Sequence, residues 1–265
     1  MNRESSAGKP DYGVDAPGVI RNLTLFGCLG LALWASVALH FWRGVLDFSI
    51  GGVRFLFPLA GAGLWSAVGL LGMATWMLWS SKVGKARGRE KLLDRIPWTG
   101  REQVLDVGCG RGLMLVGAAR RLSSGSAVGI DIWQAEDLSG NRPEAAVENA
   151  RREGVAARVE VKTADMRDLP FADGTFDVVL SCSAIHNLYK AKDRARAIGE
   201  IARVLKSGGR ALIDDIRHGH EYAALFAKNA CPEIERIGSP LASALLTAIT
   251  FGSLRPTTLL VRKES

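Results

Sequence analysis

The pattern of hydrophobic and polar positions divides the chain into two parts. In the first third, two stretches, Leu23–Trp42 and Phe55–Ser81, carry no formal charge. Each is long enough to form a helix that crosses a hydrocarbon core of about 30 Å. The pattern therefore predicts two transmembrane helices, at about residues 23–42 and 57–79. The alternative is a pair of buried core helices, but such helices rarely stay uncharged over this length.

After residue 100, short apolar runs alternate with segments that are apolar on one helical face. This alternation predicts an α/β fold, in which a parallel sheet carries helices on both faces and binds its ligand at the carboxyl ends of the strands. The expected strands are Gln103–Val107, Ala127–Ile132, Val159–Thr163, Asp177–Ser181, Arg210–Asp214 and, at the sheet edge, Thr257–Val261. The expected helices are Leu113–Leu122, Pro143–Glu153 with Asn141 as its cap, and Asp193–Leu205, ended by Gly208-Gly209.

These elements give four regions. Residues 1–22 are a polar tail, residues 23–81 a transmembrane hairpin, residues 82–100 a basic connector helix, and residues 101–265 a catalytic domain. Small residues in the two spans would allow close helix packing, although they are also typical of membrane helices in general. They are Gly27, Gly30, Gly63, Ala67, Gly69 and Gly72.

Basic residues predict the orientation of the hairpin. Five follow the second span, whereas the connecting loop carries only Arg43 and Arg54. The positive-inside rule therefore places both termini in the cytoplasm, and we expect an integral protein of a bacterial inner membrane with a short external loop. The basic cluster consists of Lys82, Lys85, Arg87, Arg89 and Lys91.

The net charge of +7 does not by itself indicate nucleic-acid binding, because the cluster after the second span both sets the topology and contacts anionic lipid. No nucleic-acid partner is therefore expected. The four cysteines form no C-x-x-C pair, so neither a metal site nor a disulfide framework is predicted. The sequence does not indicate an oligomeric state.

The segment Val104–Gly112 carries the strongest chemical signal. A short apolar strand ends in Gly108, Gly110 and Gly112, and an apolar helix follows. Glycines at this position let a ligand approach the backbone, and the N–H groups of the helix N-terminus face the same crevice. Asp131 ends the second strand, where a carboxylate suits a ribose diol. A nicotinamide oxidoreductase is less favoured, because Leu113 stands where a dinucleotide fingerprint has its third glycine.

In four ordered segments the chain resembles the class I S-adenosylmethionine (SAM)-dependent methyltransferases, over about residues 87–263. The resemblance implies a Rossmann-like, doubly wound, mostly parallel seven-stranded sheet behind the two transmembrane helices, with SAM as the cofactor. The segments are Val104–Gly112, Gly129–Trp133, Thr163–Phe171, and Phe176–Cys182 followed by Ala202–Ile213.

The resemblance also implies roles for single residues. Asp106, Gly108, Cys109 and Gly110 would hold the methionine end of SAM, with Cys109 acting through its backbone. Asp131 would take the ribose hydroxyls, beside Ile132 and Trp133. Asp165 would accept from the adenine amino group while Met166 packs on the ring, and Ser181 and Cys182 would border the transferred methyl.

His186 lies just beyond the fourth of these strands, in Ser183-Ala-Ile-His-Asn187. There it could take a proton from an acceptor heteroatom as a general base, or it could be a structural histidine. Methyltransferases of this fold that act on nucleic-acid amino groups carry an Asn/Asp-Pro-Pro-aromatic motif at this position, which this chain lacks.

The sequence therefore predicts a membrane-anchored methyltransferase that moves a methyl group from SAM to a small, lipophilic acceptor. The main alternative is a membrane-bound protein that binds SAM or a nucleotide as a sensor or scaffold, without catalysis. The uncharged segment Ile237–Leu254 could be a substrate lid, an interfacial helix or a helix that covers the sheet.

Overall fold

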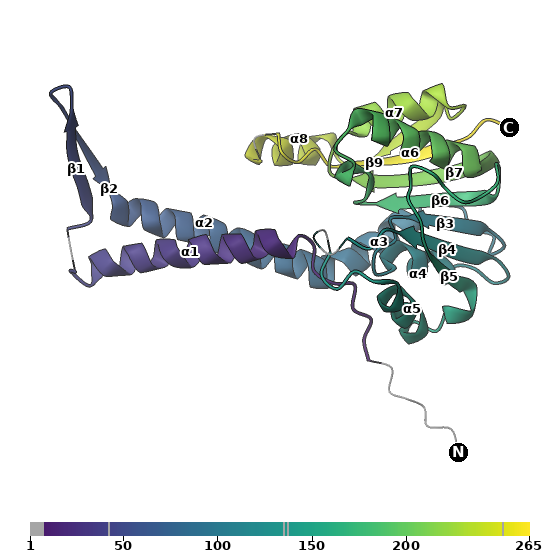
Figure 1. Cartoon of the computed structure of the whole chain (residues 1–265), viewed down its shortest axis with the longest axis horizontal. Helices are drawn as coiled ribbons and strands as arrows, with labels where there is room; N and C mark the ends of the chain where they lie inside the picture. The colour runs from purple at the N-terminus through teal and green to yellow at the C-terminus, as the bar shows by residue number, and fades with distance from the viewer. Residues whose placement is uncertain (1–7, 42, 135, 137, 251) are drawn as a thin grey trace, which may run out of the picture. The chain divides into compact units, whose positions relative to one another are not determined.

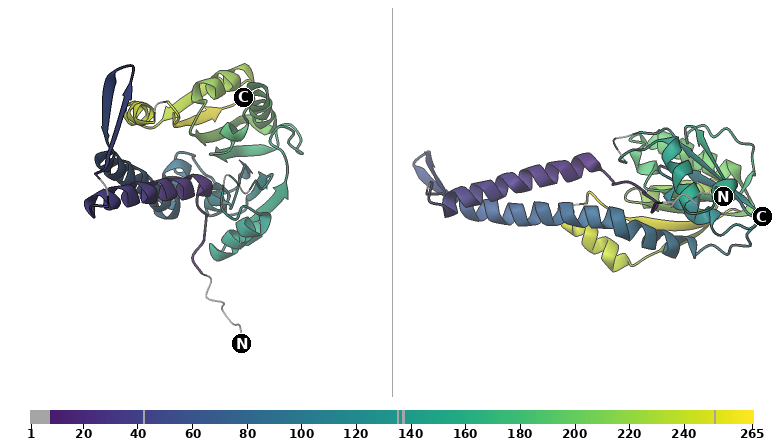
Figure 2. Two further views of the ribbon diagram at one scale, coloured as in Figure 1. Left: turned by 60° about the vertical axis from the view of Figure 1, so that its left-hand side comes forward. Right: turned by 90° about the horizontal axis from the view of Figure 1, so that it is seen from below.

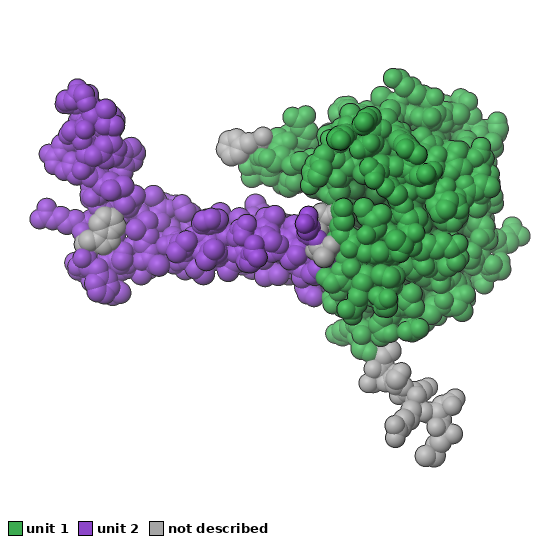
Figure 3. All heavy atoms as spheres, in the orientation of Figure 1, with its two compact units in different colours: residues 1–12, 85–135, 140–265 green, residues 13–84, 136–139 purple. Residues whose placement is uncertain are grey.

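The computed structural model describes residues 8–41, 43–134, 136, 138–250 and 252–265. The chain forms two compact units (Figure 3). One comprises residues 13–84 and 136–139, and the other comprises the remaining residues, including the N-terminal segment as far as Tyr12. Trp42, with which the first predicted span ends, lies outside the described residues.

The smaller unit is an antiparallel pair of apolar helices. α1 runs over Pro17–Ala38 and α2 over Leu59–Trp79, and the two lie side by side along their length (Figures 1 and 2). α1 begins six residues before the predicted span, because Pro17 stands at the first helical position, where its missing N–H costs nothing. A π-helical turn, Ser80–Gly84, ends the unit.

Small residues bring the two helices together, as the sequence predicts for part of the set. A Cβ on Gly30 would lie 2.7 Å from the carbonyl oxygen of Gly63, and a Cβ on Gly27 would lie 2.7 Å from Cγ of Leu71. A Cβ on Gly69 or Gly72 would meet nothing within 4 Å, so these two glycines play no part in this packing.

Both helices are long and apolar enough to cross a membrane by length and composition. Only 11% of the apolar window in α1 is buried, and only 17% of the window in the continuous helical stretch Leu59–Leu93. Helices in the core of a soluble protein would be mostly buried, which these two helices are not within the described chain.

The connection between the helices is a β-hairpin where the sequence predicts a short loop. β1 (Val45–Ile50) and β2 (Val53–Pro58) pair antiparallel through a turn at Gly51-Gly52. The sequence hides these strands because the end of β2 belongs to the uncharged stretch that begins at Phe55, while Asp47 and Arg54 make the rest resemble a polar loop.

The larger unit is a seven-stranded sheet in the order β5-β4-β3-β6-β7-β9-β8. Every neighbouring pair is parallel except the two that involve β9. The predicted Rossmann-like, mostly parallel sheet is confirmed. The strands are β3 (Gln103–Val107), β4 (Ser126–Asp131), β5 (Val159–Thr163), β6 (Phe176–Cys182), β7 (Leu205–Asp215), β8 (Glu233–Ile237) and β9 (Thr257–Arg262).

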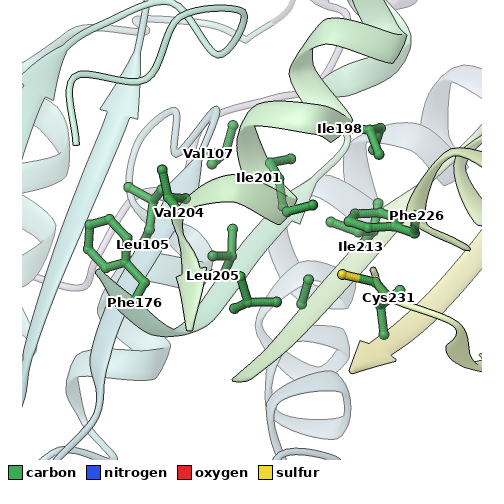
Figure 4. Packing of buried hydrophobic residues seen from close by; sticks show 14 of the residues in the cluster. Leu105, Val107, Phe176, Ile198, Ile201, Val204, Leu205, Ile213, Phe226 and Cys231 are labelled. Atoms are coloured by element: carbon green, nitrogen blue, oxygen red, sulfur yellow. The ribbon is translucent and has the colours of Figure 1, made fainter. Parts of the chain in front are cut away.

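Helices cover both faces of this sheet, and each face has its own core. Strand β3 contributes side chains to both cores. Val104 packs with α4 on one face, while Leu105 and Val107 pack with α6 and α7 on the other (Figure 4). Alternation of this kind places successive side chains on opposite faces of a sheet that is buried on both sides. The helices are α3 (Lys85–Leu93), α4 (Leu113–Ala119), α5 (Pro143–Arg152), α6 (Ala191–Val204), α7 (Gly219–Lys228) and α8 (Pro240–Ile249).

Two predictions about the last strands are wrong. Thr257–Val261 does not form the sheet edge, because β9 lies between β7 and β8, and β8 is the edge strand. The Glu-Ile-Glu-Arg-Ile sequence of β8 carries the charges that protect an exposed edge, and these charges hide it from a search for apolar runs. Gly208-Gly209 do not end α6 either, since β7 already begins at Leu205 and the glycines lie where the register to β6 shifts.

Three helical predictions also need correction. The connector is helical only as the π-turn and α3, after which the chain turns near Pro97. Asn141 does not cap α5, whose N-cap position is held by Arg142. Helix α8 does not cover the sheet, since most of its large apolar side chains are exposed, namely Leu241, Leu245, Leu246 and Ile249.

Candidate functional site

The parallel strands β3 to β7 end at one edge of the sheet, and the predicted site residues gather there. Thr257 of β9 pairs with Asp215, and Ile237 of β8 pairs with Thr258, so the start of β9 and the end of β8 lie at the same edge. Ligands of open α/β sheets bind outside the carboxyl ends of the strands. This edge is therefore the candidate site.

The glycine loop between β3 and α4 has a backbone that only glycine adopts easily. Gly108, Gly110 and Gly112 all have positive φ angles, and the amides of Gly108 and Cys109 both donate to the carbonyl of Ile130 at 2.9 Å. A Cβ on Gly108 would lie 2.3 Å from Cβ of Ala184, in the loop after β6. The glycine at this position allows the loops after β3 and β6 to touch.

Asp106 and Cys109 are buried beside this loop. Asp106 accepts a hydrogen bond of 2.8 Å from the amide of Leu115, in the first turn of α4. Burial raises its pKa to about 7, the charge of Asp131 acts in the same direction, and the bond from Leu115 opposes them. Burial also raises the pKa of the Cys109 thiol. A neutral, buried thiol fits the expectation that Cys109 contributes its backbone, and the contact of either residue with SAM stays a prediction.

Asp131 is fixed in place at the end of β4. One carboxylate oxygen accepts from the amide of Gly110 at 2.9 Å, and the other accepts from the amide of Trp133 at 2.6 Å and from the side-chain amide of Asn141 at 3.4 Å. The carboxylate is thus linked directly to the glycine loop. Ile132, the next residue, is 47% exposed beside it.

Asn141 supplies the observation that tests whether this place fits the ribose of SAM. Its carbonyl oxygen Oδ1 is buried and has no hydrogen-bond partner among the residues that the structure describes. A buried acceptor without a donor is costly, and an incoming hydroxyl would satisfy it. Asn141 therefore fits a hydroxylated ligand next to Asp131. The sequence does not reveal this role, because Asn141 stands just before Pro143 and is interpreted there as a helix cap.

Asp165 and Met166, which are predicted to contact the adenine of SAM, follow β5. Both oxygens of Asp165 are held by the Arg167 guanidinium, at distances of 2.5 to 3.0 Å, which lowers the pKa of the carboxyl. An acceptor role toward adenine has to share this carboxylate with Arg167. Met166 does lie at the site, since its Cε is 3.7 Å from a Cβ built on Gly108.

Ser181 and Cys182, at the end of β6, have partners inside the protein. Ser181 is 2% exposed and donates to the carbonyl of Val107 at 2.9 Å, which ties β6 to β3. Cys182 contacts a carboxylate oxygen of Asp214 at 3.6 Å. The Ser181 hydroxyl therefore links two strands at the sheet edge, and its contact with the cofactor stays a prediction.

His186 lies in the 3-10 turn Ile185–Asn187 and is bound to Asp215 at the end of β7. Its Nδ1 is 2.5 Å from Oδ1 of Asp215, and its amide donates to Oδ2 at 3.0 Å. Asp215 is 3% exposed and also accepts from Tyr222 at 3.3 Å. A carboxylate can only accept, so Nδ1 carries the proton and Nε2 keeps its lone pair in the neutral ring. This pairing fixes the orientation of the ring, as a general base and a structural histidine would both require, so the role of His186 stays a prediction.

Asp215 could not be recognised from the sequence as the partner of His186, because it lies 29 residues further along the chain. The pair Asp214-Asp215 at the end of an apolar strand is the sequence signal that could have identified it. Burying a carboxylate there costs free energy unless the carboxylate has a hydrogen-bonding or charged partner. Among the described residues no group of His, Cys, Asp and Glu could hold a metal ion.

The N-terminal segment 8–12 forms a strap on the glycine loop, which the sequence did not indicate. Arg111, inside the loop, donates through Nε to the carbonyl of Asp11 and through Nη2 to its carboxylate, both at 2.8 Å. Asn149 of α5 bridges the two segments, since its Nδ2 donates to the carbonyls of both Asp11 and Arg111 at 2.9 Å. Further along, Tyr12 binds Glu153 and Arg89.

We expect the strap to support cofactor binding. Asp11→Ala removes a charge-assisted bond to Arg111 that is partly exposed, so it should weaken SAM binding by about 1 kcal/mol, or roughly fivefold. Tyr12→Phe is the matched control, because it removes only the hydroxyl contacts with Glu153 and Arg89. Calorimetric titration of both variants would contradict the role of the strap if Asp11→Ala bound SAM as tightly as Tyr12→Phe.

Comparison with known proteins matches the larger unit. Residues 105–213 match the family model described as a methyltransferase domain. The chain is similar to methyltransferase GfsG of Streptomyces halstedii, with 37% identity over 49% of this chain and 43% of that protein. It is also similar to the ubiquinone/menaquinone biosynthesis C-methyltransferase UbiE of Geotalea daltonii, with 34% identity over 47% of this chain and 50% of that protein. The chain thus spans half or less of the length of these two relatives.

Solved structures share the fold at low sequence identity. The structure of geranyl diphosphate methyltransferase in complex with SAM has a TM-score of 0.52 and 19% identity, over 68% of this chain and 85% of that one. The YcgJ protein of Bacillus has a TM-score of 0.51 and 18% identity, over 68% of this chain and 99% of that one. With the sheet order and the matched family model, residues 105–213 are therefore a Rossmann-like methyltransferase domain of the SAM-dependent class.

Proposed function

We propose that this chain is a membrane-anchored methyltransferase that moves a methyl group from SAM to a small, lipophilic acceptor. The observation that carries the catalytic part is the pair of His186 and Asp215, which stands at the same edge as the glycine loop. A protein that only senses SAM would need the loop and Asp131, but not an oriented base beside them.

The residues of this edge divide the task. The glycine loop, Asp131 and Asn141 would hold SAM, which supplies an activated methyl group on its sulfonium sulfur. Nε2 of His186 would take the proton from the acceptor heteroatom as that atom attacks the methyl. Asp215 would keep the ring in the required tautomer and would stabilise the imidazolium that forms. Much of the remaining rate acceleration would come from holding the two reactants in line.

Helix α8 supports an apolar acceptor. It connects the end of β8 to the start of β9, so it belongs to the edge that carries His186. The chain after it is tied to the loop beyond β7, since the amide of Arg255 donates to the carbonyl of Ile216 at 2.7 Å. Its exposed leucines therefore offer apolar surface next to the site, as expected of a lid or an entry surface. The similarity to UbiE, named for ubiquinone and menaquinone biosynthesis, points in the same direction.

The path of the chain supports the proposed membrane hairpin. The strap belongs to the larger unit, the chain then runs through α1 and α2, and Lys85 begins the larger unit again. A chain that leaves a domain and returns to it can cross a membrane only an even number of times. Two crossings by α1 and α2 agree with this count, and the basic residues after α2 favour the cytoplasmic side for the domain.

The membrane part predicts that alkaline carbonate will not release the full-length chain from bacterial membranes. In right-side-out vesicles, protease added from outside should reach only the hairpin between α1 and α2. Release by carbonate, or cleavage of the methyltransferase domain from outside, would overturn the topology. Neither result would bear on the chemistry.

The catalytic part is tested with the full-length chain in lipid vesicles. Calorimetry with SAM and NAD should give binding of SAM alone, and labelled SAM with membrane lipid extract should give a labelled, organic-soluble product. Binding of SAM without transfer to any fraction of the extract would favour the sensor. A labelled product that stays in the aqueous phase would remove the lipophilic acceptor from the proposal.

A further inference from the structure

The β-hairpin between α1 and α2 has one face that is entirely apolar. Successive residues of a strand point to opposite faces, and the register pairs Phe48 with Phe55 and Ser49 with Arg54. The positions that share a face with Phe48 are all apolar. The opposite face is mixed, and its polar residues Asp47, Ser49 and Arg54 alternate with Val45, Leu56 and Pro58. The apolar face consists of Leu46, Phe48, Ile50, Val53, Phe55 and Phe57.

This face has no cover within the described chain. Every residue of both strands is exposed, and Ile50 is 66% exposed. The aromatic rings on it pack against one another, with the Phe48 ring centroid 5.5 Å from that of Phe55 and 5.9 Å from that of Phe57. On the other face Arg54 pairs with Asp47 through Nε at 2.7 Å. The hairpin therefore has one entirely apolar face, and all of its charged side chains lie on the other face.

Such a hairpin needs a surface to lie on. An isolated two-stranded sheet is marginally stable in water, and an exposed aromatic patch normally marks a contact with another body. The loss of water from the apolar face would stabilise the hairpin in the conformation that the structure describes.

The base of the hairpin identifies that surface. Pro58, the last residue of β2, is followed directly by Leu59 at the start of α2, whose amide donates to the carbonyl of Gly44 at 2.8 Å. The hairpin is thus attached directly to α2, while residues 39–44 join it to the end of α1. If α1 and α2 cross a membrane, as proposed above, the hairpin emerges at the bilayer surface opposite the methyltransferase domain.

The unpaired backbone groups of the hairpin limit how deeply it can lie in the bilayer. A two-stranded sheet leaves the outer edge of each strand without a neighbouring strand, and hydrocarbon does not tolerate such edges. The interfacial region supplies water and head groups to these edges and favours aromatic side chains. We propose that the hairpin is an interfacial anchor, which lies on the outer surface of the bilayer with its apolar face in the lipid and Asp47, Ser49 and Arg54 toward water.

The test compares neighbouring positions on the two faces. Cys28, the exposed cysteine, is replaced by Ala, and a nitroxide label is attached at Phe48→Cys, Ser49→Cys or, as a control in α1, Leu29→Cys. The full-length chain is reconstituted in phosphatidylcholine vesicles, and the background is taken from the chain without an added cysteine. Collision rates with oxygen, which enters lipid, and with a nickel chelate, which stays in water, then report the surroundings of each label.

We expect the label at position 48 to meet oxygen severalfold more readily than nickel, and the label at position 49 to show the reverse. A label at position 48 that meets nickel freely, while the label at position 29 does not, would overturn the anchor and leave the membrane spans intact. Free access of nickel to position 29 would overturn the spans and the anchor together. A label at position 48 shielded from both reagents would mean that protein, such as a second copy of the chain, covers the face, and would also overturn the proposal.

Discussion

Replacement of His186 by Ala is expected to lower the turnover of SAM by about 100-fold or more, while the affinity for SAM stays unchanged. The reason is the geometry at the sheet edge, where Asp215 binds Nδ1 of the ring and leaves Nε2 to accept a proton. Single-turnover rates with labelled SAM, together with calorimetric affinities, would separate the chemical step from binding.

His220→Ala is the matched control for this prediction. His220 also lies in the larger unit, but it is exposed and contacts Arg236, away from Asp215. Its loss should leave turnover unchanged. Full turnover in His186→Ala would mean that the enzyme acts only by aligning the two reactants. A His186→Ala protein that does not fold would indicate that the histidine has a structural role.

Gly108→Ala should abolish measurable SAM binding and lower the stability of the domain. The new methyl group would stand 2.3 Å from Cβ of Ala184, and φ at this residue is 74°. A clash in a packed region costs about 1–3 kcal/mol, and a left-handed backbone costs a residue with a Cβ about 1–2 kcal/mol more. Thermal unfolding and calorimetry would measure the two effects.

Gly154→Ala separates the cost of the clash from the cost of the left-handed backbone. Gly154 has nearly the same φ, 73°, but a Cβ there would meet nothing within 4 Å. This variant should therefore be destabilised only by the left-handed backbone, by about 1–2 kcal/mol, and should bind SAM normally. Equal destabilisation by the two variants would mean that the loop after β6 can move away from Gly108, and that the contact between the loops does not define the site.

The core strands and the glycine loop could be predicted from the sequence because their signals are local. β3, β4 and β6 are short apolar runs since both faces of the sheet are buried, and Gly108 and Asp131 stand at fixed positions relative to these runs. In contrast, β8 is an edge strand with charges, and no local pattern of apolar residues distinguishes it from a loop.

Most partners of the site residues could not be predicted, because they lie far along the chain. The hydroxyl of Ser181 binds the carbonyl of Val107, and His186 binds Asp215, which lies 29 residues later. The partner of Asp165 is local, since Arg167 lies two residues on, but the sequence does not show that its guanidinium binds this carboxylate. The contact between Arg111 and Asp11 joins residues 100 positions apart and requires the folded sheet to bring them together.

The strap also sets an order of events during synthesis. Asp11 is made early, but its partners Arg111 and Asn149 follow only after both apolar helices have left the ribosome. At about 5–20 residues per second, the strap waits several seconds for the second of these partners. The glycine loop therefore gains the contacts of Asp11 with Arg111 and Asn149 only after α1 and α2 have been synthesised.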